Sequence, residues 1–486
     1  MVFAFLPSFV FPASLNLEER VIEHTLKNGL KILMMERHQS PTVAAYIRFN
    51  VGSVDEVTGN SGIAHMLEHM LFKGTRTLGT TDYKKEKFLI DLINRVAGFL
   101  ADEKRKGLKT DPEKIQKLEK KIKELQAEHK KFVISDEFSQ LYSKNGGVGF
   151  NAGTSADGTT YIIQLPSNKL ELWAAIESDR MREPVLREFY QERAVVMEER
   201  RMRVENSAWG KLYEQFLASA FTAHPYGVPI IGWASDIQNL NRTETKKFLK
   251  TYYAPNNAVM GIVGDINPQE VIGLIEKYFG DILTQPSPPP VLGQEPEQSG
   301  ERRVEVIHNA EPQLLIGYHK PTLPSHADFV FDVIDAILSS GRTSRLYKNV
   351  VLKKQIATHV STFGSPGSRY PNLFVFSGTP RHPHTVEELE KAIDEEIEKI
   401  KKEPVTKREF QKVINQLEAS MIRGLKSNGG MASKLIYYEG VVGDWRYILN
   451  HIKELKNITP EDIMKTAQKY LIKSNKTVAF ITKENP

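Results

Sequence analysis

The 486-residue chain contains no cysteine. This absence excludes disulfides, thiol nucleophiles, iron–sulfur clusters and cysteine-type zinc sites, so any metal would be bound by His, Asp or Glu. Long hydrophobic runs are missing as well: no stretch beyond the N-terminus reaches about 18 uncharged apolar residues, and we expect no transmembrane segment. The net charge is only +5, from 65 basic and 60 acidic residues, which does not indicate nucleic-acid binding unless the charge is clustered.

Charged residues are also missing from residues 1–17, ahead of Glu18. This segment is apolar and aromatic, but it is too short to span a bilayer. It also lacks the Lys or Arg that precedes the apolar run of an export signal. We interpret it as an N-terminal arm or a weak signal-like segment. The compartment therefore stays open between the bacterial cytoplasm and the periplasm.

A stretch rich in proline, serine and glutamine, residues 284–300, predicts an exposed linker. At roughly 100–200 residues per domain, a chain of this length is expected to hold two to four domains. The linker divides it into two predicted parts, residues 18–283 and 301–486. Both parts end alike, with a helix to Tyr253 or Tyr470 that is followed by a strand. We interpret this likeness as an internal duplication, with a chance likeness of two helix–strand endings as the alternative.

Apolar residues at helical spacing within residues 84–132 predict a helical hairpin with a turn near Gly107. Its two apolar stripes consist of Phe88, Leu89, Leu92, Val96 and Leu100, and of Ile115, Leu118, Ile122 and Leu125. The first part of the chain exceeds the second by about 65 residues, so we interpret residues 84–148 as an insertion. Residues 102–131 hold 11 basic and 7 acidic residues, which is +4 of the net +5. Because these signs are interleaved, as on a solvated helix, we predict no nucleic-acid partner.

Further helices are predicted at residues 167–181 and 186–219. Strands are predicted at residues 42–51, 148–154 and 160–163, and a hairpin turn at Asn28-Gly29. Strands and helices mix without strict strand–helix–strand alternation, which favours an α+β fold.

The motif that carries chemistry is His-x-x-Glu-His, formed by His65, Glu68 and His69. On a helix, residues four apart lie about 40° apart around the axis, so both imidazoles can bind one ion with Glu68 beside the same face. Zinc lowers the pKa of a bound water, and Glu68 would accept its proton and later donate it. Apolar neighbours predict a buried helix, in which these groups are costly unless they coordinate or pair. The alternative is two surface histidines paired with a glutamate.

A catalytic zinc usually has three protein ligands and a water. Without cysteine, the third ligand would be Glu, Asp or His. Glu192 and Glu199 lie seven residues apart on one predicted helix and therefore share a face. The nearby Arg200, Arg201 and Arg203 make a surface salt bridge the alternative, and spacing alone does not decide between the two.

The sequence resembles the pitrilysin-type metallopeptidases with an inverted zinc motif, which include insulysin, the mitochondrial processing peptidase and bacterial relatives. The matching segments are GIAHMLEHMLFKGT (62–75), FNAGTSADGTTYIIQLP (150–166), ERAVVMEERRM (192–202) and YYAPNNAVMGIVGDI (252–266), with a looser match at 427–449. Apart from the hairpin and the linker, the resemblance covers most of residues 20–486.

The resemblance implies an α+β fold of two tandem homologous α/β sandwich domains that form half of a clam-like peptidase chamber. It implies one zinc ion per chain, bound in the first domain by His65, His69 and Glu199, with Glu68 as the base. It makes Glu192 a residue that orients a histidine. It also implies an edge strand that binds unfolded peptides by backbone hydrogen bonds. The residues of this substrate-binding strand are Phe150, Asn151, Ala152, Gly153 and Thr154. For Asn151, a simple turn residue is the alternative.

Two features depart from the family pattern. The helical hairpin is one. The other is the second domain, where many active members carry an Arg and a Tyr seven residues apart, and the Tyr stabilises the tetrahedral oxyanion. Here Val351 and Thr358 occupy those places, and no Arg beyond residue 301 has a Tyr seven residues later. A shifted alignment would offer His359 or Arg369-Tyr370 instead.

We therefore predict a zinc endopeptidase that acts on unfolded peptides as the zinc-bearing subunit of a heterodimer. Its homologous partner would supply the Arg/Tyr pair. The alternatives are a self-sufficient homodimeric peptidase and a non-catalytic scaffold or assembly subunit. The scaffold is less favoured, because family members of that kind typically lose zinc ligands and this chain has them all.

Overall fold

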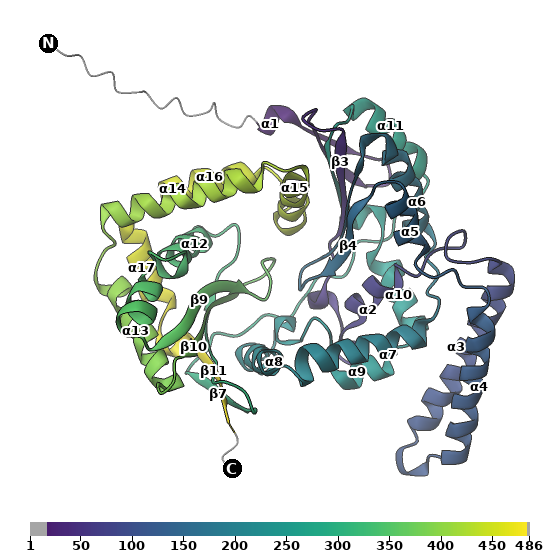
Figure 1. Ribbon diagram of the computed structural model, residues 1–486, viewed down its shortest axis with the longest axis horizontal. Helices are drawn as coiled ribbons and strands as arrows, with labels where there is room; N and C mark the ends of the chain where they lie inside the picture. The colour runs from purple at the N-terminus through teal and green to yellow at the C-terminus, as the bar shows by residue number, and fades with distance from the viewer. Residues whose placement is uncertain (1–16, 484–486) are drawn as a thin grey trace.

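The structure is a computed structural model that describes residues 17–483 (Figure 1). The predicted N-terminal arm or signal-like segment lies, except for Leu17, outside the described residues. Among the helices of residues 17–483, none has both the length and the apolar character that crossing a bilayer requires.

Two sheets organise the chain, one in each half. The first has six strands in the order β1-β2-β6-β3-β5-β4. They are β1 (Val21–Thr25), β2 (Lys31–Glu36), β3 (Thr42–Phe49), β4 (Val148–Thr154), β5 (Thr159–Pro166) and β6 (Ala258–Gly264). The second has five strands in the order β7-β11-β8-β10-β9. They are β7 (Arg302–Ile307), β8 (Leu314–Lys320), β9 (Ala357–Ser365), β10 (Asn372–Pro380) and β11 (Lys476–Thr482).

The two sheets share one topology. In the first sheet β2 is parallel to β6, and β3, β5 and β4 follow with antiparallel pairing. In the second sheet β7 is parallel to β11, and β8, β10 and β9 follow in the same way. Strand for strand, β2 to β6 correspond to β7 to β11, and β1 is an addition at the edge. This correspondence supports the internal duplication, and the predicted α+β class with two related domains is confirmed.

Helices cover both sheets. Those of the first half are α1 (Leu17–Arg20), α2 (Ile63–Met70), α3 (Tyr83–Lys104), α4 (Pro112–Lys130), α5 (Glu137–Lys144), α6 (Leu170–Arg182), α7 (Phe189–Arg200), α8 (Ala208–Ala220), α9 (Ala234–Asn239), α10 (Arg242–Tyr252) and α11 (Pro268–Phe279). Those of the second half are α12 (His326–Ser339), α13 (Val386–Lys402), α14 (Lys407–Gly424), α15 (Asn428–Val442), α16 (Tyr447–Asn457) and α17 (Pro460–Tyr470).

One helix of each half packs against the sheet of the other half. Helix α8 packs on the second sheet, where Phe216 lies in one buried cluster with Leu315. Helix α15 packs on the first sheet, where Ile436 lies in one buried cluster with Val263. Figure 1 shows both helices between the two halves. Residues 284–300, which contain no helix or strand, make the covalent connection.

The prediction of one continuous helix over residues 186–219 is wrong. Helix α7 ends at Arg200, a π-helical turn follows at Arg201–Glu205, and α8 begins at Ala208. A Cβ on Gly210 would lie 2.0 Å from the Arg203 carbonyl oxygen, so a glycine is needed where α8 folds back against this turn. The break lets α7 contact α2 while α8 reaches the other sheet.

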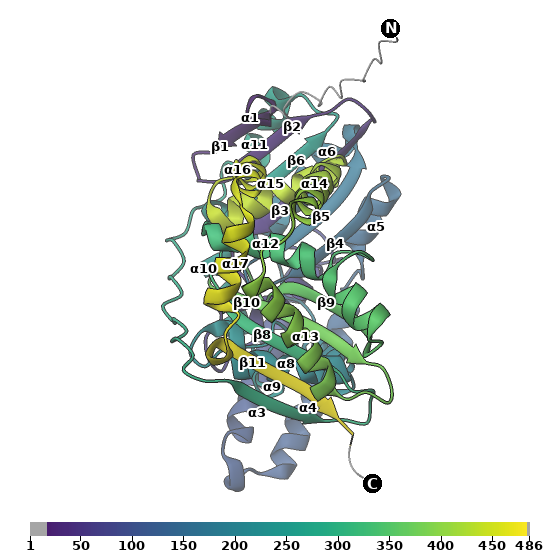
Figure 2. The same ribbon diagram turned by 90° about the vertical axis from the view of Figure 1, so that its left-hand side faces the viewer.

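Helices α3 and α4 form the predicted helical hairpin, which projects from the body in both views (Figures 1 and 2). A small core joins Ile93 and Val96 of α3 to Ile122 and Leu125 of α4. The prediction that Phe88 belongs to this core is wrong, since its side chain is 70% exposed.

A buried ion-pair network fastens the hairpin to the body. Arg187, just before α7, donates from Nε to Glu86 Oε1 at 2.7 Å, and His129 Nε2 lies 3.0 Å from the same oxygen. All three side chains are at most 1% exposed. The guanidinium also donates to the carbonyl oxygens of Thr75 and Leu78, at 2.5 and 3.1 Å. The network therefore joins the hairpin to the loop that follows α2.

Replacing Arg187 by Met should lower the free energy of unfolding by about 3–5 kcal/mol, because Glu86 would stay buried without its cation. Thermal denaturation followed by circular dichroism measures the loss. Arg182→Met is the matched control: its ion pair with Asp281 is exposed, and its loss should cost about 0–1 kcal/mol. Equal losses in the two variants would contradict a fastening role for the buried network.

Candidate metal centre

The eight-residue helix α2 carries the His-x-x-Glu-His motif. Gly62, which precedes it, has φ 84°, and a Cβ there would lie 2.4 Å from the Ile231 carbonyl oxygen. Only glycine fits this left-handed, crowded position. The Glu56 carboxylate accepts from the amides of Gly62 and Ala64, both at 2.8 Å. It thereby satisfies donors at the positive end of the helix dipole. A capped, buried helix holds the two histidines firmly.

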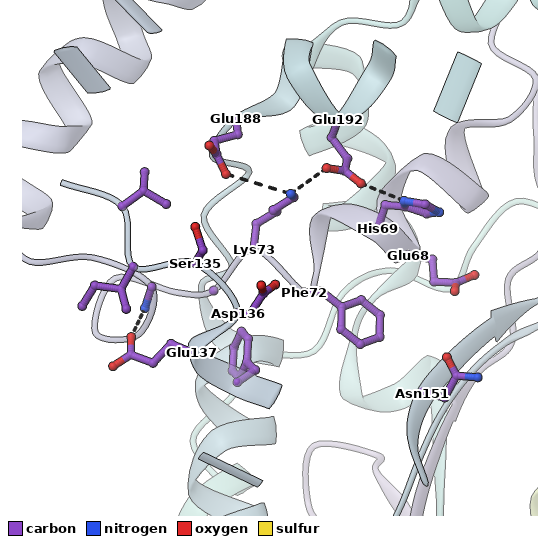
Figure 3. A pocket seen from close by; sticks show the side chains of 15 residues that line it. Glu68, His69, Phe72, Lys73, Ser135, Asp136, Glu137, Asn151, Glu188 and Glu192 are labelled. Atoms are coloured by element: carbon purple, nitrogen blue, oxygen red, sulfur yellow. Dashed lines mark hydrogen bonds and ion pairs between the residues drawn. The ribbon is translucent and has the colours of Figure 1, made fainter. Parts of the chain in front are cut away.

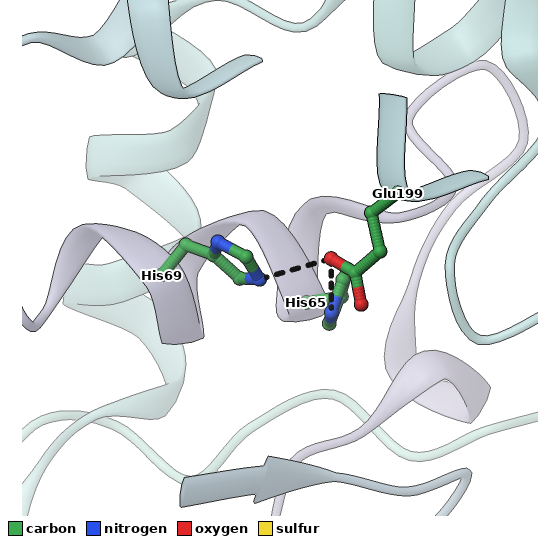
Figure 4. A group of neighbouring side chains, drawn as sticks. All are labelled: His65, His69 and Glu199. Carbon is green, nitrogen blue, oxygen red and sulfur yellow. Dashed lines mark ion pairs between the residues drawn. The ribbon is translucent and has the colours of Figure 1, made fainter. Parts of the chain in front are cut away.

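His65, His69 and Glu199 converge at one point, as Figure 4 shows. Glu199 Oε2 lies 3.7 Å from His65 Nε2 and 3.3 Å from His69 Nε2. The ligand atoms of the three residues all lie within 4.8 Å of one another. The other oxygen of Glu199 lies 3.0 Å from Arg203 Nη2. The salt bridge that competed with the ligand interpretation thus exists, but it uses the oxygen that faces away from the histidines.

The observed separations suit a zinc ion. Tetrahedral ligands about 2.0–2.1 Å from zinc lie about 3.4 Å apart, which is close to the 3.3 and 3.7 Å between Glu199 Oε2 and the imidazole nitrogens. Two imidazoles and one carboxylate are also a donor set typical of catalytic zinc. The residues present therefore fit the metal.

The pKa values of the two histidines shift in opposite directions. Burial lowers the pKa of His65 to about 3, and His69 acts in the same direction. Its imidazole is thus neutral at pH 7, which is the form that binds a metal. Burial opposes charge on His69 too, but the hydrogen bond and charge of Glu192 and the charge of Glu199 outweigh it and raise the pKa.

Glu192 contacts the other nitrogen of His69. Its Oε1 lies 2.9 Å from His69 Nδ1, and its Oε2 lies 2.6 Å from Lys73 Nζ. Burial would raise the pKa of Glu192, but hydrogen bonds from His69 and Lys73 outweigh it and lower the pKa. Because Glu192 and Glu199 lie two turns apart on α7, this one helix contacts both nitrogens of one imidazole. A hydrogen bond at Nδ1 leaves Nε2 free for a metal.

Glu192→Gln should weaken zinc affinity by about 10–100-fold, the usual cost of losing a partner of a metal-bound histidine. Competition with a chromophoric chelator measures the affinity. Glu188→Gln is the matched control, because Glu188 approaches only Lys73, at 3.9 Å, and not the histidine. Unchanged affinity in Glu192→Gln would rule out the orienting role.

Glu68 is on α2, and its carboxylate contacts the edge strand β4. Thr154 Oγ1 donates to Glu68 Oε2 at 2.6 Å. Burial raises the pKa of Glu68, against the hydrogen bond from Thr154. A carboxyl whose pKa is moved toward neutrality is suited to accept and return a proton near pH 7.

The predicted substrate strand is β4, and it pairs on one side only among the described residues, with β5. Phe150 and Ala152 are half-buried, with the Phe150 ring centroid 5.2 Å from that of Phe72. Asn151 and Gly153 are exposed. Asn151 lies within the strand, so the alternative of a simple turn residue is wrong.

A cavity of about 480 Å³ lies beside Glu68 and His69 (Figure 3). Lys73 and Glu188 line one side of it. Residues 133–138, which run from the end of the hairpin into the first turn of α5, line another. The segment that follows the helical hairpin therefore forms part of the wall beside the candidate metal centre.

Comparisons with known proteins agree with this geometry. Two family models match, "Insulinase (Peptidase family M16)" over residues 31–89 and "Peptidase M16 inactive domain" over residues 239–417. The zinc protease PqqE of Helicobacter pylori is 28% identical over 481 residues, which is 96% of this chain and 95% of that protein. The chain belongs to the M16 peptidase family.

Solved structures show the same M16 fold. The crystal structure of a protease from Helicobacter pylori matches with a TM-score of 0.80 at 28% identity, over 95% of this chain and 99% of that one. The periplasmic protease PqqL from Escherichia coli matches with a TM-score of 0.70 at 16% identity, over 96% of this chain but only 48% of that one, a likeness of fold alone. The family, and with it the metalloprotease class, confirms what the sequence predicted.

Three parts of the M16 site were not predicted from the sequence: Glu56, Lys73 and residues 133–138. Lys73 lies three residues beyond the end of α2 and pairs with Glu192 of α7, a contact that no local spacing indicates. Glu56 and residues 133–138 reach α2 only through the tertiary fold, and nothing in their sequence indicates it.

Val351 and Thr358, the positions that the resemblance assigns to the Arg and Tyr of many active members, hold neither residue. Val351 is buried in the π-helical segment Tyr347–Lys353, and Thr358 is exposed on β9. Arg369, considered as a substitute, has Nη2 3.0 Å from Asp55 Oδ1. Its guanidinium therefore links the second half to the first.

Proposed function

We propose that this chain is a zinc-dependent endopeptidase that hydrolyses unfolded peptides, with Glu68 as the general base. The observation that carries the proposal is the convergence of His65, His69 and Glu199 within 4.8 Å. Glu68 lies on the same helix as the two histidines and contacts β4, which within residues 17–483 is paired on one side only.

A zinc ion held by these three residues would supply a Lewis acid and lower the pKa of the attacking water. Glu68 then accepts the proton of that water and transfers it to the leaving amine. Thr154 occupies Glu68 Oε2, which leaves Oε1 for the proton. Glu192 keeps His69 in the orientation that presents Nε2.

The free edge of β4 supports an extended substrate. Its backbone groups, which are unpaired on one side within residues 17–483, can form a hydrogen-bonded ladder with extended peptides of many different sequences. Because Thr154 is at the end of β4 and contacts Glu68, a peptide added to this edge would pass the base.

We also propose that a homologous subunit completes the site. The support is that Val351 and Thr358 supply neither an Arg nor a Tyr. In addition, this chain covers only 48% of the PqqL chain, which leaves room there for a second unit of similar size.

The test is to mix the zinc-loaded chain with a homologous chain that carries the Arg/Tyr pair and to follow cleavage of a quenched, extended peptide. The mixture should turn over about 10²–10³-fold faster than this chain alone, the usual effect of one oxyanion donor. Full activity from this chain alone as a monomer would contradict the partner. Activity that rises with the concentration of this chain alone would indicate the homodimer.

A non-catalytic scaffold is the second candidate, because a model of an inactive M16 domain matches residues 239–417. That match does not include α2, where the candidate ligands lie. A chain that purifies without stoichiometric zinc and cleaves no peptide, alone or mixed, would favour the scaffold.

A further inference from the structure

The second half contains a polar pocket at the place that corresponds to the metal centre. Helix α12 follows β8 as α2 follows β3, and β9 has the edge position of β4. In the first half Thr154 Oγ1 donates to Glu68 at 2.6 Å. In the second half Thr362 Oγ1 on β9 donates to Asp335 Oδ1 on α12 at 2.5 Å. The duplication thus repeats a contact between an edge-strand hydroxyl and a helix carboxylate.

This pocket is a real cavity, of about 420 Å³, formed by β8, β9, β10, α12, α15 and α16. Phe331 and Phe374 contribute apolar surface to its lining. Figure 1 shows β4 on the side of the first half that faces the second half, and β9 on the side of the second half that faces the first. A peptide bound along β4 would therefore lie on the side of the first half that faces β9, which lines this pocket.

Two of the three carboxylates in the pocket already have partners. Asp328 is paired with Lys320, and Asp332 Oδ2 lies 3.2 Å from His451 Nε2. Asp335 has no ion-pair partner within residues 17–483. Burial raises the pKa of Asp335 to about 6, with a contribution from Asp332. The pocket therefore holds a carboxyl group that accepts a hydrogen bond from Thr362 but has no cationic partner within residues 17–483.

A second acceptor in the pocket is also unused. Asn372, at the start of β10, is 3% exposed, and its Oδ1 has no hydrogen-bond partner among the described residues. Its amide nitrogen is held by the Gly367 carbonyl oxygen at 2.5 Å. A buried acceptor without a donor is costly, and native structures rarely leave one so.

Lys434 is the remaining charged group of the lining, and it too lacks a carboxylate partner within residues 17–483. It is only half-buried, and its Nζ lies 5.7 and 5.9 Å from the ring centroids of Tyr437 and Tyr438. Water can hydrate it, whereas the Asn372 oxygen is sealed from solvent. The unmet demand of the pocket is therefore for hydrogen-bond donors and positive charge.

We propose that this pocket binds a cationic group, an ammonium or a guanidinium, of the peptide substrate, with Asp335 as the acceptor. The aromatic side chains would contact the aliphatic stem of a Lys or Arg. This inference rests on the proposed peptidase function. It adds that the second half selects substrates with a positive charge away from the scissile bond.

The test measures peptide binding to the full chain carrying Glu68→Gln, which prevents cleavage. Fluorescent dodecapeptides with a single Lys moved along the sequence are compared with norleucine versions by anisotropy. At one Lys position the Kd should be about tenfold lower than for norleucine. Asp335→Asn should abolish that difference, and the matched surface control Asp444→Asn should keep it. N-acetylated peptides distinguish a side chain from the terminal ammonium as the source of the charge.

The Lys434→Gln variant provides a second test, in which the expected change in peptide affinity is opposite in direction to that of Asp335→Asn. Removing this positive charge should lower the Kd of the Lys peptide or leave that Kd unchanged. If Lys and norleucine peptides bind alike at every position, or if Asp335→Asn keeps their difference, the proposal is wrong. Weaker binding in Lys434→Gln would indicate an anionic ligand and would also overturn it. Cleavage of these peptides by the wild-type chain, measured separately, shows whether the peptidase function stands without the pocket.

Discussion

Glu68→Gln should reduce kcat for peptide hydrolysis by about 10³-fold, within the range that a positioned general base contributes. The amide keeps the size of the side chain and its hydrogen bond from Thr154, but it cannot accept the proton of the attacking water. Zinc content should stay at one ion per chain, because Glu68 is not among the three converging ligands. Steady-state cleavage of a quenched peptide and metal analysis of the same sample measure both effects.

The matched control for this change is Glu198→Gln. Glu198 is exposed, is paired with Arg201 at 3.0 Å, and lies beside the proposed ligand Glu199 in the sequence. The activity of the Glu198→Gln variant should be within about twofold of wild type, since an exposed ion pair of this kind contributes little to stability. If Glu68→Gln retained wild-type turnover, the assignment of the base would fail.

His65→Ala should abolish stoichiometric zinc binding. Loss of a direct ligand should weaken zinc affinity by more than about 100-fold, beyond the effect expected at Glu192, which acts through His69. Activity should fall with metal content, and the fold should persist, because His65 is one residue of a helix held by Glu56 and by apolar contacts. Isothermal titration of the apo protein with zinc provides the measurement.

His38→Ala is the matched control for His65→Ala. His38 also lies between two carboxylates, with ring nitrogens 2.5 Å from Glu36 and 2.6 Å from Asp265, but it is on the surface. The His38→Ala variant should bind zinc and cleave peptide like the wild type. Retention of one tightly bound zinc in His65→Ala would mean that the ion is held elsewhere.

The metal motif was predictable because its geometry is local. Helical spacing alone places His65, Glu68 and His69 on one face of a helix, and in the structure all three residues belong to the helix α2. The seven-residue spacing of Glu192 and Glu199 likewise placed both on one side of α7. Whether Glu199 reaches the histidines depends on how α7 packs against α2, which no local pattern encodes; there the family resemblance was needed.

Other features escaped because they depend on tertiary contacts. The helix breaks after Arg200 because α7 packs against α2 whereas α8 packs against the second sheet. The helical pattern of the sequence continues across this break and does not indicate it. Phe88 has the spacing of a core residue, yet α3 turns Ile93 and Val96 inward instead. The role of residues 133–138 in the wall of the cavity arises only from the fold, since the hairpin returns beside α2 through the Arg187 network.

The most direct test of the account is to locate the metal. A crystal of the zinc-loaded chain, measured on both sides of the zinc absorption edge, should show one anomalous peak. The account predicts that peak about 2.0–2.2 Å from His65 Nε2, His69 Nε2 and an oxygen of Glu199. A peak at any other place, or none at full zinc loading, would contradict it.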